Sequence, residues 1–153
     1  MELENTKKSI LKFKKFSENA KISGRATSGS AGIDLCACIE QDVVIKPGEK
    51  VFIKCGIGIS LENSNYVGLI FARSGLSVKH GITLTNGVGV IDSDYRGELG
   101  VGLYNISDKE YVVKSGDRIA QLLIMRVETP DLQEVQELDT TDRNTGGFGS
   151  TGK

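Results

Sequence analysis

The stretch "GITLTNGVGVID", residues 81–92, carries the pattern that decides the fold of this chain. Two short runs that contain β-branched residues flank Asn86 and Gly87. An Asn-Gly pair between two such runs is the strongest short-range signal for a β-hairpin. We therefore expect two short strands joined by a tight hairpin turn at Asn86 and Gly87.

The same pattern of short β-branched runs and turn residues continues on both sides of this stretch. Short segments with β-branched residues alternate with turn signals about every ten residues, a spacing typical of β-sandwiches and barrels. These segments are "KKSILKFKK" (7–15), "DVVIKPGEKVFIKCGIGISL" (42–61), "GELGVGLYNIS" (97–107) and "EYVVKSGD" (110–117). The sequence therefore predicts an all-β protein.

Two segments fit more than one structure. "SGDRIAQLLIMRV" (115–127) fits a helix capped by Ser115, but its apolar residues also alternate as they do in a strand. We favour a strand because the neighbouring segments are strands. "RSGLSVKH" (73–80) predicts either a short helix or a turn.

Length and composition limit the classes of protein. A chain of 153 residues suits one domain with a sizeable core, and a formal net charge of −1 gives no electrostatic reason to expect nucleic acid as a partner. We find neither an apolar run that could span a membrane nor a secretory signal. The odd number of cysteines, three, fits reduced thiols. We expect a cytoplasmic protein without a membrane partner.

A zinc site is an alternative use of the cysteines. Its ligands would be Cys36, Cys38, Cys55 and His80. We favour a structural role instead, because C-x-C is not the usual zinc-knuckle spacing and cysteine is often a small core residue.

The character of the chain changes at about residue 129. The following residues include few apolar side chains and end in a glycine-rich run. We expect a β body over 1–128 and a flexible C-terminal arm with a closing tail over 129–153. From Gly147 the ending "GGFGSTGK" matches seven of the eight P-loop positions, but the helix into which a P-loop opens is missing.

The tail has groups that suit a nucleotide. Successive N–H groups of a glycine-rich loop can form an anion-binding nest. Arg143, Ser150 and Thr151 add donors for phosphate, and Phe148 offers a ring on which a nucleobase can stack. A disordered terminus is the alternative, since the composition fits it as well.

A second candidate phosphate grip lies in "ARSGLS" (72–77). Arg73, Ser74 and Gly75 place a guanidinium, a hydroxyl and a backbone amide within three residues. Alone this signal is weak, because Arg-Ser-Gly is also a common turn.

Carboxylates stand out in two further segments. Asp92 and Asp94 in "VIDSDYRGE" (90–98) are spaced to share one face of a strand, as a general base or metal partner would, although a solvated acidic turn is the alternative. Asp34 in "SAGIDL" (30–35) enters an apolar strand, where a carboxylate is costly unless it is paired, hydrogen-bonded or directed at a metal. No activated nucleophile is recognisable, so we expect attack by water rather than covalent catalysis.

These motifs, in this order, resemble those of the homotrimeric dUTPase family (deoxyuridine triphosphate nucleotidohydrolases). Five blocks at ordered spacing, with the aromatic-glycine tail last, are highly specific, and they span nearly the whole chain. The blocks are "AGIDL" (31–35), "ARSGLS" (72–77), "GVGVIDSDYRGE" (87–98), "GDRIAQLL" (116–123) and "RNTGGFGSTG" (143–152).

The resemblance implies a fold and an activity. The fold is a jelly-roll-like distorted barrel with a strand at 118–127, assembled as a homotrimer with shared active sites. The activity is Mg²⁺-assisted hydrolysis of dUTP to dUMP and pyrophosphate by attack of water on the α-phosphate. This reaction would keep uracil out of DNA and supply dUMP for dTMP synthesis.

The resemblance also implies roles for single residues. Asp92 matches the general base, and Asp34 matches the carboxylate that orients waters on the metal. At a shared site, Asp92 and the tail would come from different chains. The residues that match phosphate or water contacts are Arg73, Ser74, Gly75 and Gln121.

The nucleoside contacts follow in the same way. Asn86 and the backbone at Gly87 match the uracil pocket, where Gly87 and Gly89 would leave no room for the methyl group of thymine. Tyr95 matches the residue that packs under the deoxyribose. The closing tail comprises Arg143, Phe148, Gly149, Ser150 and Thr151, with Phe148 over the base and the arginine and hydroxyls near the γ-phosphate.

The chain departs from the family pattern at Ile33, Ala72 and Asn144, and none of these positions supplies a catalytic group. Asn144 stands where glycine is usual, but asparagine tolerates a left-handed backbone, so we expect the tail still to close. Two alternative functions are a dCTP deaminase, which shares the fold, and a nucleotide-sensing regulatory protein. The "GGFGSTG" ending and Asp92 argue against the first, and the lack of an inserted interaction segment argues against the second.

Overall fold

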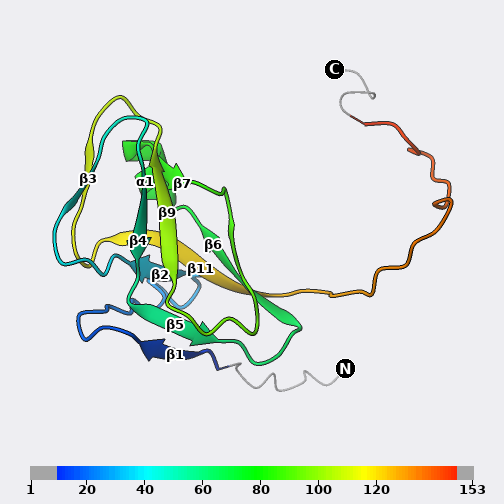
Figure 1. Cartoon of the computed structure of the whole chain (residues 1–153), viewed down its shortest axis with the longest axis horizontal. Coiled ribbons are helices and arrows are strands. Elements are labelled where there is room, and N and C mark those ends of the chain that lie inside the picture. Colours follow the sequence, from blue (N-terminus) through cyan, green and yellow to red (C-terminus); the bar gives the residue numbers. More distant parts are fainter. Residues whose placement is uncertain (1–9, 148–153) are drawn as a thin grey trace.

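The structure, a computed structural model, describes residues 10–147. Within this range the chain forms eleven strands and one short helix, which confirms the predicted all-β fold (Figure 1). The elements are β1 (Lys12–Lys15), β2 (Ile33–Cys36), β3 (Val43–Ile45), β4 (Lys50–Lys54), β5 (Ile57–Ser60), β6 (Tyr66–Phe71), α1 (Ser74–His80), β7 (Ile82–Leu84), β8 (Gly89–Ile91), β9 (Gly100–Asn105), β10 (Tyr111–Val113) and β11 (Arg118–Arg126).

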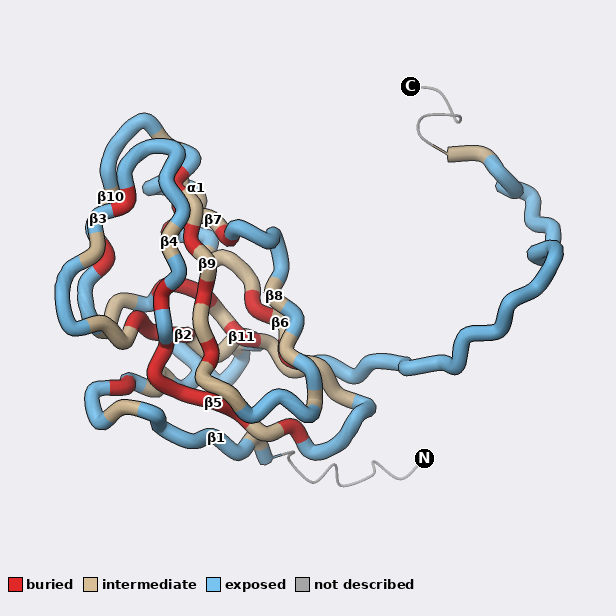
Figure 2. The backbone as a smooth tube through the Cα atoms, in the orientation of Figure 1, coloured by how far each residue is buried: buried red, intermediate tan, exposed pale blue. Residues whose placement is uncertain are grey.

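Antiparallel pairing arranges the described strands in small sheets. The largest sheet has the strand order β2-β11-β6-β8, and the next has the order β4-β9-β7. Two further pairs are β1 with β5 and β3 with β10. Figure 2 shows that the buried parts of these strands lie on the inside of the body.

β11 lies in the middle of the largest sheet. It pairs with β2 on one side and with β6 on the other, so a helix over the same residues would leave backbone groups of both neighbours without partners. The ambiguous segment is therefore a strand, as the resemblance implied. The register places Gln121 opposite Asp34 on β2 and Phe71 on β6.

The turn at Asn86 and Gly87 is present, but the hairpin predicted around it is wrong. β7 pairs with β9 and β8 pairs with β6, so the strands on the two sides of the turn belong to different sheets. Gly87 has the left-handed φ of 72° that such a turn favours. Asn86 and Gly87 determine the local turn. The partner of each strand is determined instead by where its apolar side chains become buried, as those of Ile82 and Leu84 are. The turn therefore carries the chain from one sheet to the other.

The segment that was ambiguous between helix and turn forms α1. Arg73 is its N-cap, with an extended backbone, and Leu76 is buried against the core. The helix ends at Gly81, whose φ of 64° is left-handed and whose N–H donates to the carbonyl of Ser77. Because α1 follows β6 closely, Arg73 and Ser74 lie at one end of the largest sheet.

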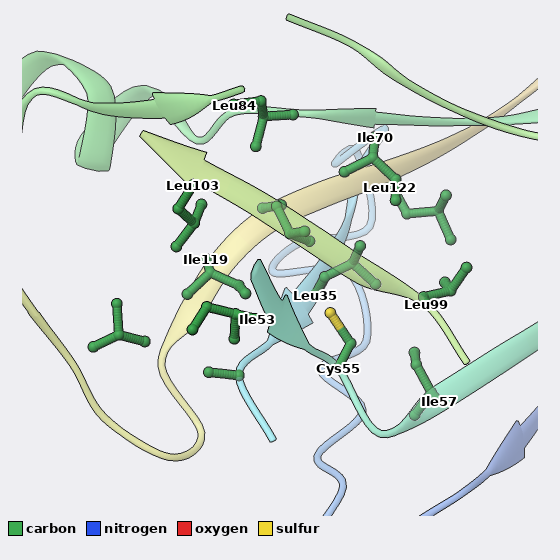
Figure 3. Close-up of a cluster of buried hydrophobic side chains, with 14 of the residues drawn as sticks. Leu35, Ile53, Cys55, Ile57, Ile70, Leu84, Leu99, Leu103, Ile119 and Leu122 are labelled. Carbon is green, nitrogen blue, oxygen red and sulfur yellow. The ribbon is translucent and has the colours of Figure 1, made fainter. Parts of the chain in front are cut away.

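One cluster of buried apolar side chains connects the sheets (Figure 3). Leu35, Ile119 and Leu122 from the largest sheet join Ile53 and Leu103 from the sheet of β4 and β9. Burial of each such side chain contributes about 1.5–3 kcal/mol, so this cluster holds the sheets in fixed relative positions.

The described part of the arm has no regular structure. β11 ends at Arg126, and residues 128–147 are almost entirely exposed and extend away from the body (Figures 1 and 2). The division into a body over 1–128 and an arm over 129–153 stays a prediction. In residues 10–147 we find no helix with the length and apolar character needed to cross a membrane.

Candidate active site

Asp34 joins two arginines at the edge of the largest sheet. Arg73 Nε donates to Asp34 Oδ1 at 3.0 Å, and Arg118 Nη1 donates to Asp34 Oδ2 at 3.2 Å. Arg73 Nη1 also donates to the backbone carbonyl of Arg118 at 3.1 Å. The Asp34 side chain is 14% exposed, and the two guanidiniums supply the pairing that a carboxylate in an apolar strand requires.

We call Asp34, Arg73 and Arg118 the arginine–aspartate cluster. It has two positive charges and one negative charge, so it attracts anions. A guanidinium has five N–H donors, and the contacts within the cluster use only some of them. The remaining donors suit the oxygen atoms of a phosphate.

A polar pocket lies beside this cluster. Gln121 Nε2 donates to the carbonyl of Ala72 at 3.0 Å, which ties β11 to the segment that enters α1. A Cβ atom at Gly32 would lie 2.7 Å from Gln121 Oε1, so a side chain there would displace the glutamine. The pocket is lined by Ala26, Ser30, Gly32, Asp34, Arg73, Ser74, Gly75, Arg118 and Gln121. The structure thus brings together Asp34 and the predicted phosphate-contacting residues of the body.

Asp92 lies in a second pocket, directly after β8. The backbone N–H of Tyr95 donates to the Asp92 carbonyl at 3.1 Å and closes a turn. Asp94 lies within that turn, so the expectation that Asp92 and Asp94 share one face of a strand is wrong: the strand ends at Ile91. The pocket is lined by Phe52, Val90, Ile91, Asp92, Tyr95, Glu98, Leu99 and Gly100. Asp92 is exposed and is not neutralised by any ion pair in residues 10–147.

The predicted uracil contacts lie in the turn before β8. Asn86 and Gly87 are both exposed, and the Val88 N–H donates to the Asn86 carbonyl at 2.8 Å. Gly89 pairs with Ile70 on β6, and a Cβ atom at Gly89 would lie 3.1 Å from the Ile70 Cβ. The turn therefore offers exposed backbone groups on a segment that is tied to the largest sheet.

The predicted site residues do not all meet within one chain. The polar pocket and the Asp92 pocket have no lining residue in common. Arg143 is exposed in the arm, where its Nε donates to the Gly146 carbonyl at 3.0 Å. Asn144 has a φ of 43°, the left-handed conformation expected of it. The other predicted tail residues lie outside the described range: Phe148, Gly149, Ser150 and Thr151.

The cysteines and His80 do not form the alternative zinc site. Within residues 10–147 no three His, Cys, Asp or Glu side chains are grouped as metal ligands. His80 stacks against Tyr111, with the ring centroids 5.1 Å apart. Burial, with the nearby Cys36 and Glu98, raises the pKa of the Cys55 thiol to about 12. Cys55 is buried among the apolar side chains of the core, which is the structural role expected of it.

The polar pocket does fit Mg²⁺ that arrives with a nucleotide. Mg²⁺ is usually held by one or two carboxylates together with substrate phosphates and waters, rather than by a cage of protein ligands. Asp34 is such a carboxylate, and a carboxylate has about four lone-pair sites, so its bonds to Arg73 and Arg118 leave acceptor capacity for metal-bound water.

The family model that matches this chain is that of dUTPase, over residues 18–152. The chain belongs to the dUTPase family. The match covers both pockets and the arm, and it confirms the family that the five sequence blocks resembled.

Named dUTPase relatives cover most of the chain. The deoxyuridine 5'-triphosphate nucleotidohydrolase of Finegoldia magna is 51% identical over 127 residues, which are 83% of this chain and 88% of the relative. The enzyme of the same name from Syntrophotalea carbinolica is 46% identical over 142 residues, 93% of this chain and 96% of the relative.

Solved dUTPase structures share the fold. A mutant of the Staphylococcus bacteriophage 80alpha dUTPase with dUpNHpp has a TM-score of 0.86 at 30% identity, covering 95% of this chain and 100% of that chain. A mutant dUTPase from phage phi11 of S. aureus, described for the coordination of a structural Mg(II) ion, has a TM-score of 0.77 at 29% identity, covering 86% of this chain and 100% of that chain.

Two residues that belong to the candidate site of this dUTPase were not predicted from the sequence. Arg118 pairs with Asp34 from 84 positions away, and Glu98 lines the Asp92 pocket. Both lie within recognised blocks, so the need of Asp34 for a cationic partner could have directed attention to Arg118. No local pattern specifies which of the arginines in those blocks fulfils that need.

Proposed function

We propose that this chain is a dUTP diphosphatase, which hydrolyses dUTP to dUMP and pyrophosphate. The observation that carries the proposal is the arginine–aspartate cluster beside a polar pocket, in a chain 46–51% identical to enzymes named for this reaction. By this reaction the enzyme keeps uracil out of DNA and supplies dUMP for dTMP synthesis.

The polar pocket holds the triphosphate. Arg73 and Arg118 present guanidinium donors in an orientation that Asp34 maintains. Ser74 adds a hydroxyl and Gly75 a backbone N–H on the same rim. Gln121 contacts a phosphate or a bound water through its amide group. When Mg²⁺ is bound, it neutralises part of the phosphate charge, and Asp34 then orients the waters on the metal.

Asp92 is the general base. It accepts a proton from the water that attacks the α-phosphate, and a positioned carboxylate in this role contributes roughly 10²–10⁴-fold to the rate. Its exposed position after β8 leaves it accessible to a water and a substrate. The reaction needs no covalent intermediate, because the water itself is the nucleophile.

The turn between β7 and β8 selects the base, and Tyr95 selects the sugar. Asn86 and the backbone at Gly87 pair with uracil, and cytosine is rejected because its donors and acceptors leave buried polar groups without partners. Gly87 and Gly89 keep the backbone close to the base, so that the thymine methyl group does not fit. Tyr95 packs under the deoxyribose.

The working enzyme is a homotrimer with shared active sites. The polar pocket and the Asp92 pocket have no lining residue in common, which supports a site to which more than one chain contributes. The arm over 129–153 supplies the closing tail in trans, since residues 129–143 alone can extend about 50 Å. In this tail Phe148 covers the base, the backbone at Gly149 belongs to the anion nest, and Arg143, Ser150 and Thr151 contact the γ-phosphate. We place the enzyme in the cytoplasm, where its three free thiols stay reduced.

Pyrophosphate release tests this function directly. The purified chain is incubated with Mg²⁺ and dUTP, dTTP, dCTP or UTP in parallel, and pyrophosphate and nucleotide products are measured. We expect dUMP and pyrophosphate from dUTP, with little release from the other three. Conversion of dCTP to a deaminated product would instead identify a dCTP deaminase, and binding of dUTP without turnover would identify a nucleotide sensor.

A further inference from the structure

The ring of Tyr95 lies against its own loop. The Tyr95 hydroxyl donates to the backbone carbonyl of Glu98 at 3.0 Å. The ring lies over Gly97, where an added Cβ atom would overlap the Tyr95 hydroxyl and Cζ. The position of the ring therefore depends on the absence of a side chain at Gly97.

This loop is itself fixed to the corner between β4 and β5. The Cys55 N–H donates to the Leu99 carbonyl at 2.9 Å, and the Leu99 N–H donates to the Ile57 carbonyl at 2.7 Å. Glu98 Oε1 accepts the Gly56 N–H at 3.0 Å. Residues 97–99, on which Tyr95 lies, are thus held by backbone bonds and by one carboxylate.

The two contacts of the Glu98 carboxylate contribute unequally to the stability of the loop. Lys54 Nζ lies 3.1 Å from Glu98 Oε2, but the Lys54 side chain is 67% exposed, so water screens this ion pair. Gly56 is buried, and its N–H would lose its acceptor if the Glu98 side chain were removed. A buried donor without a partner is costly, so the bond to Gly56 is the stronger of the two contacts by which the carboxylate holds the loop.

We propose that Gly97 and Glu98 are positioning residues that set the Tyr95 ring against the sugar and thereby determine how well the site separates dUTP from UTP. The inference rests on the proposed function, in which Tyr95 packs under the deoxyribose. A ribose differs by one hydroxyl group, and a ring displaced from its place leaves room for that hydroxyl. Selection of the sugar then depends on Gly97 and Glu98 through the ring of Tyr95.

A double-mutant cycle tests the role of Gly97. The ratio of kcat/KM for dUTP to that for UTP is measured for the wild type, Gly97→Ala, Tyr95→Ala and the double variant. We expect each single substitution to lower this ratio on the order of 10-fold. In the Tyr95→Ala background Gly97→Ala should have almost no further effect, because no ring remains to be displaced. If Gly97→Ala lowers the dUTP to UTP ratio as much in the Tyr95→Ala background as in the wild type, the proposal is overturned.

Glu98 is tested by three substitutions. Glu98→Ala should lower the dUTP to UTP ratio, whereas Glu98→Gln should largely keep it, because the amide oxygen still accepts the Gly56 N–H. Lys54→Met should leave the ratio unchanged, since only the exposed ion pair is lost. If Glu98→Ala does not fold, Glu98→Asp, which withdraws the carboxylate by one methylene, provides the same comparison.

A matched control separates positioning from stability. Glu49 Oε2 also accepts a backbone N–H, that of Lys46 at 2.9 Å, but in a turn outside both pockets. Glu49→Ala should lower the melting temperature without changing the dUTP to UTP ratio. If Glu98→Ala behaves in the same way, Glu98 is only structural and the inference fails, while the proposed function stands. A wild-type chain that does not hydrolyse dUTP would overturn both.

Discussion

At the scale of single residues, the Asp34 carboxylate holds two cationic side chains in place. It binds Arg73 through one oxygen and Arg118 through the other, so two cations are held side by side without a large repulsion between them. Removal of the carboxylate would leave both guanidiniums without their anionic partner, and Arg73 would keep only its bond to the Arg118 carbonyl. Asp34 thus orients both guanidiniums at the polar pocket, as the proposed binding of a triphosphate requires.

Asp92 provides the most direct test of the chemistry. Asp92→Asn keeps the size of the side chain and its ability to accept hydrogen bonds, but an amide cannot take a proton from water. We expect kcat to fall by at least about 100-fold while the affinity for dUTP changes little. Steady-state pyrophosphate release and equilibrium nucleotide binding measure the two quantities.

Asp94→Asn is the matched control for that substitution. Asp94 is exposed in the same turn, two residues from Asp92, and it lies outside the Asp92 pocket. Its substitution should leave kcat within a factor of a few of the wild type. Equal losses in the two variants would mean that the turn as a whole, rather than the Asp92 carboxylate, is required.

The Cys55 thiol should make stability depend on alkaline pH. Its pKa rises from 9.0 to about 12 on folding, chiefly through burial, so the unfolded chain loses this proton first as the pH increases. Ionisation therefore favours the unfolded state, and the free energy of unfolding should fall by about 1.4 kcal/mol from this group between pH 8 and pH 10.

Urea unfolding of the wild type and of Cys55→Ala at both pH values measures this contribution. The variant lacks the thiol, so its loss of stability between pH 8 and pH 10 should be smaller by that amount. Identical pH dependence in the two proteins would show that Cys55 does not titrate differently in the folded and unfolded chains.

At the scale of elements, β11 connects the site to the core. Ile119 and Leu122 of this strand are buried, while Gln121 between them reaches the polar pocket. Arg118 at the start of the strand completes the arginine–aspartate cluster. One strand therefore anchors the core and presents two side chains to the polar pocket at a fixed spacing.

The end of α1 allows a test of local packing. Gly81 has a left-handed backbone, and a Cβ atom there would lie 2.7 Å from the Ser107 Cβ. Gly48 has a similar φ of 76° but open space where its Cβ would be. Gly48→Ala should lower the free energy of unfolding by about 1–2 kcal/mol through backbone strain, and Gly81→Ala should cost more because it adds the clash.

Urea denaturation measures both losses. A similar loss in the two variants would show that the loop at Ser107 moves aside without cost. A larger loss for Gly81→Ala that is accompanied by weaker dUTP binding would also connect the end of α1 to the proposed phosphate contacts at its start.

The sequence predicts local features of these elements better than their partners. The Asn-Gly turn could be predicted because it depends on two adjacent residues, but the pairing of β7 and β8 with strands of different sheets depends on where distant apolar residues are buried. That Asp34 needs an ion pair, a hydrogen bond or a metal follows from its apolar surroundings. That Arg118 is one of the cations does not, because 84 residues separate them. For residues 115–127 the apolar pattern fitted both a helix and a strand. The neighbouring strands favoured a strand, and the resemblance implied the same.

At the scale of the whole molecule, the central proposal is that one chain holds only part of an active site. The polar pocket and the Asp92 pocket are separate, and the described arm extends away from the body (Figure 1). Under the proposed function, assembly completes the active site, because each substrate would contact groups from more than one chain. It follows that chains inactive for different reasons should complement one another.

The measurement that tests this account most directly combines two inactive variants. One is Asp92→Asn with an intact tail, and the other is a truncation after Asp142 with an intact Asp92. They are unfolded and refolded together in equal amounts, so that the chains mix at random. If Asp92 and the tail of a site come from different chains, roughly a quarter of the sites receive both an intact base and an intact tail. We predict dUTP hydrolysis near that fraction of the wild-type rate, and none when the two variants are mixed without refolding. Mixed trimers that are verified by mass and remain inactive would contradict the shared site.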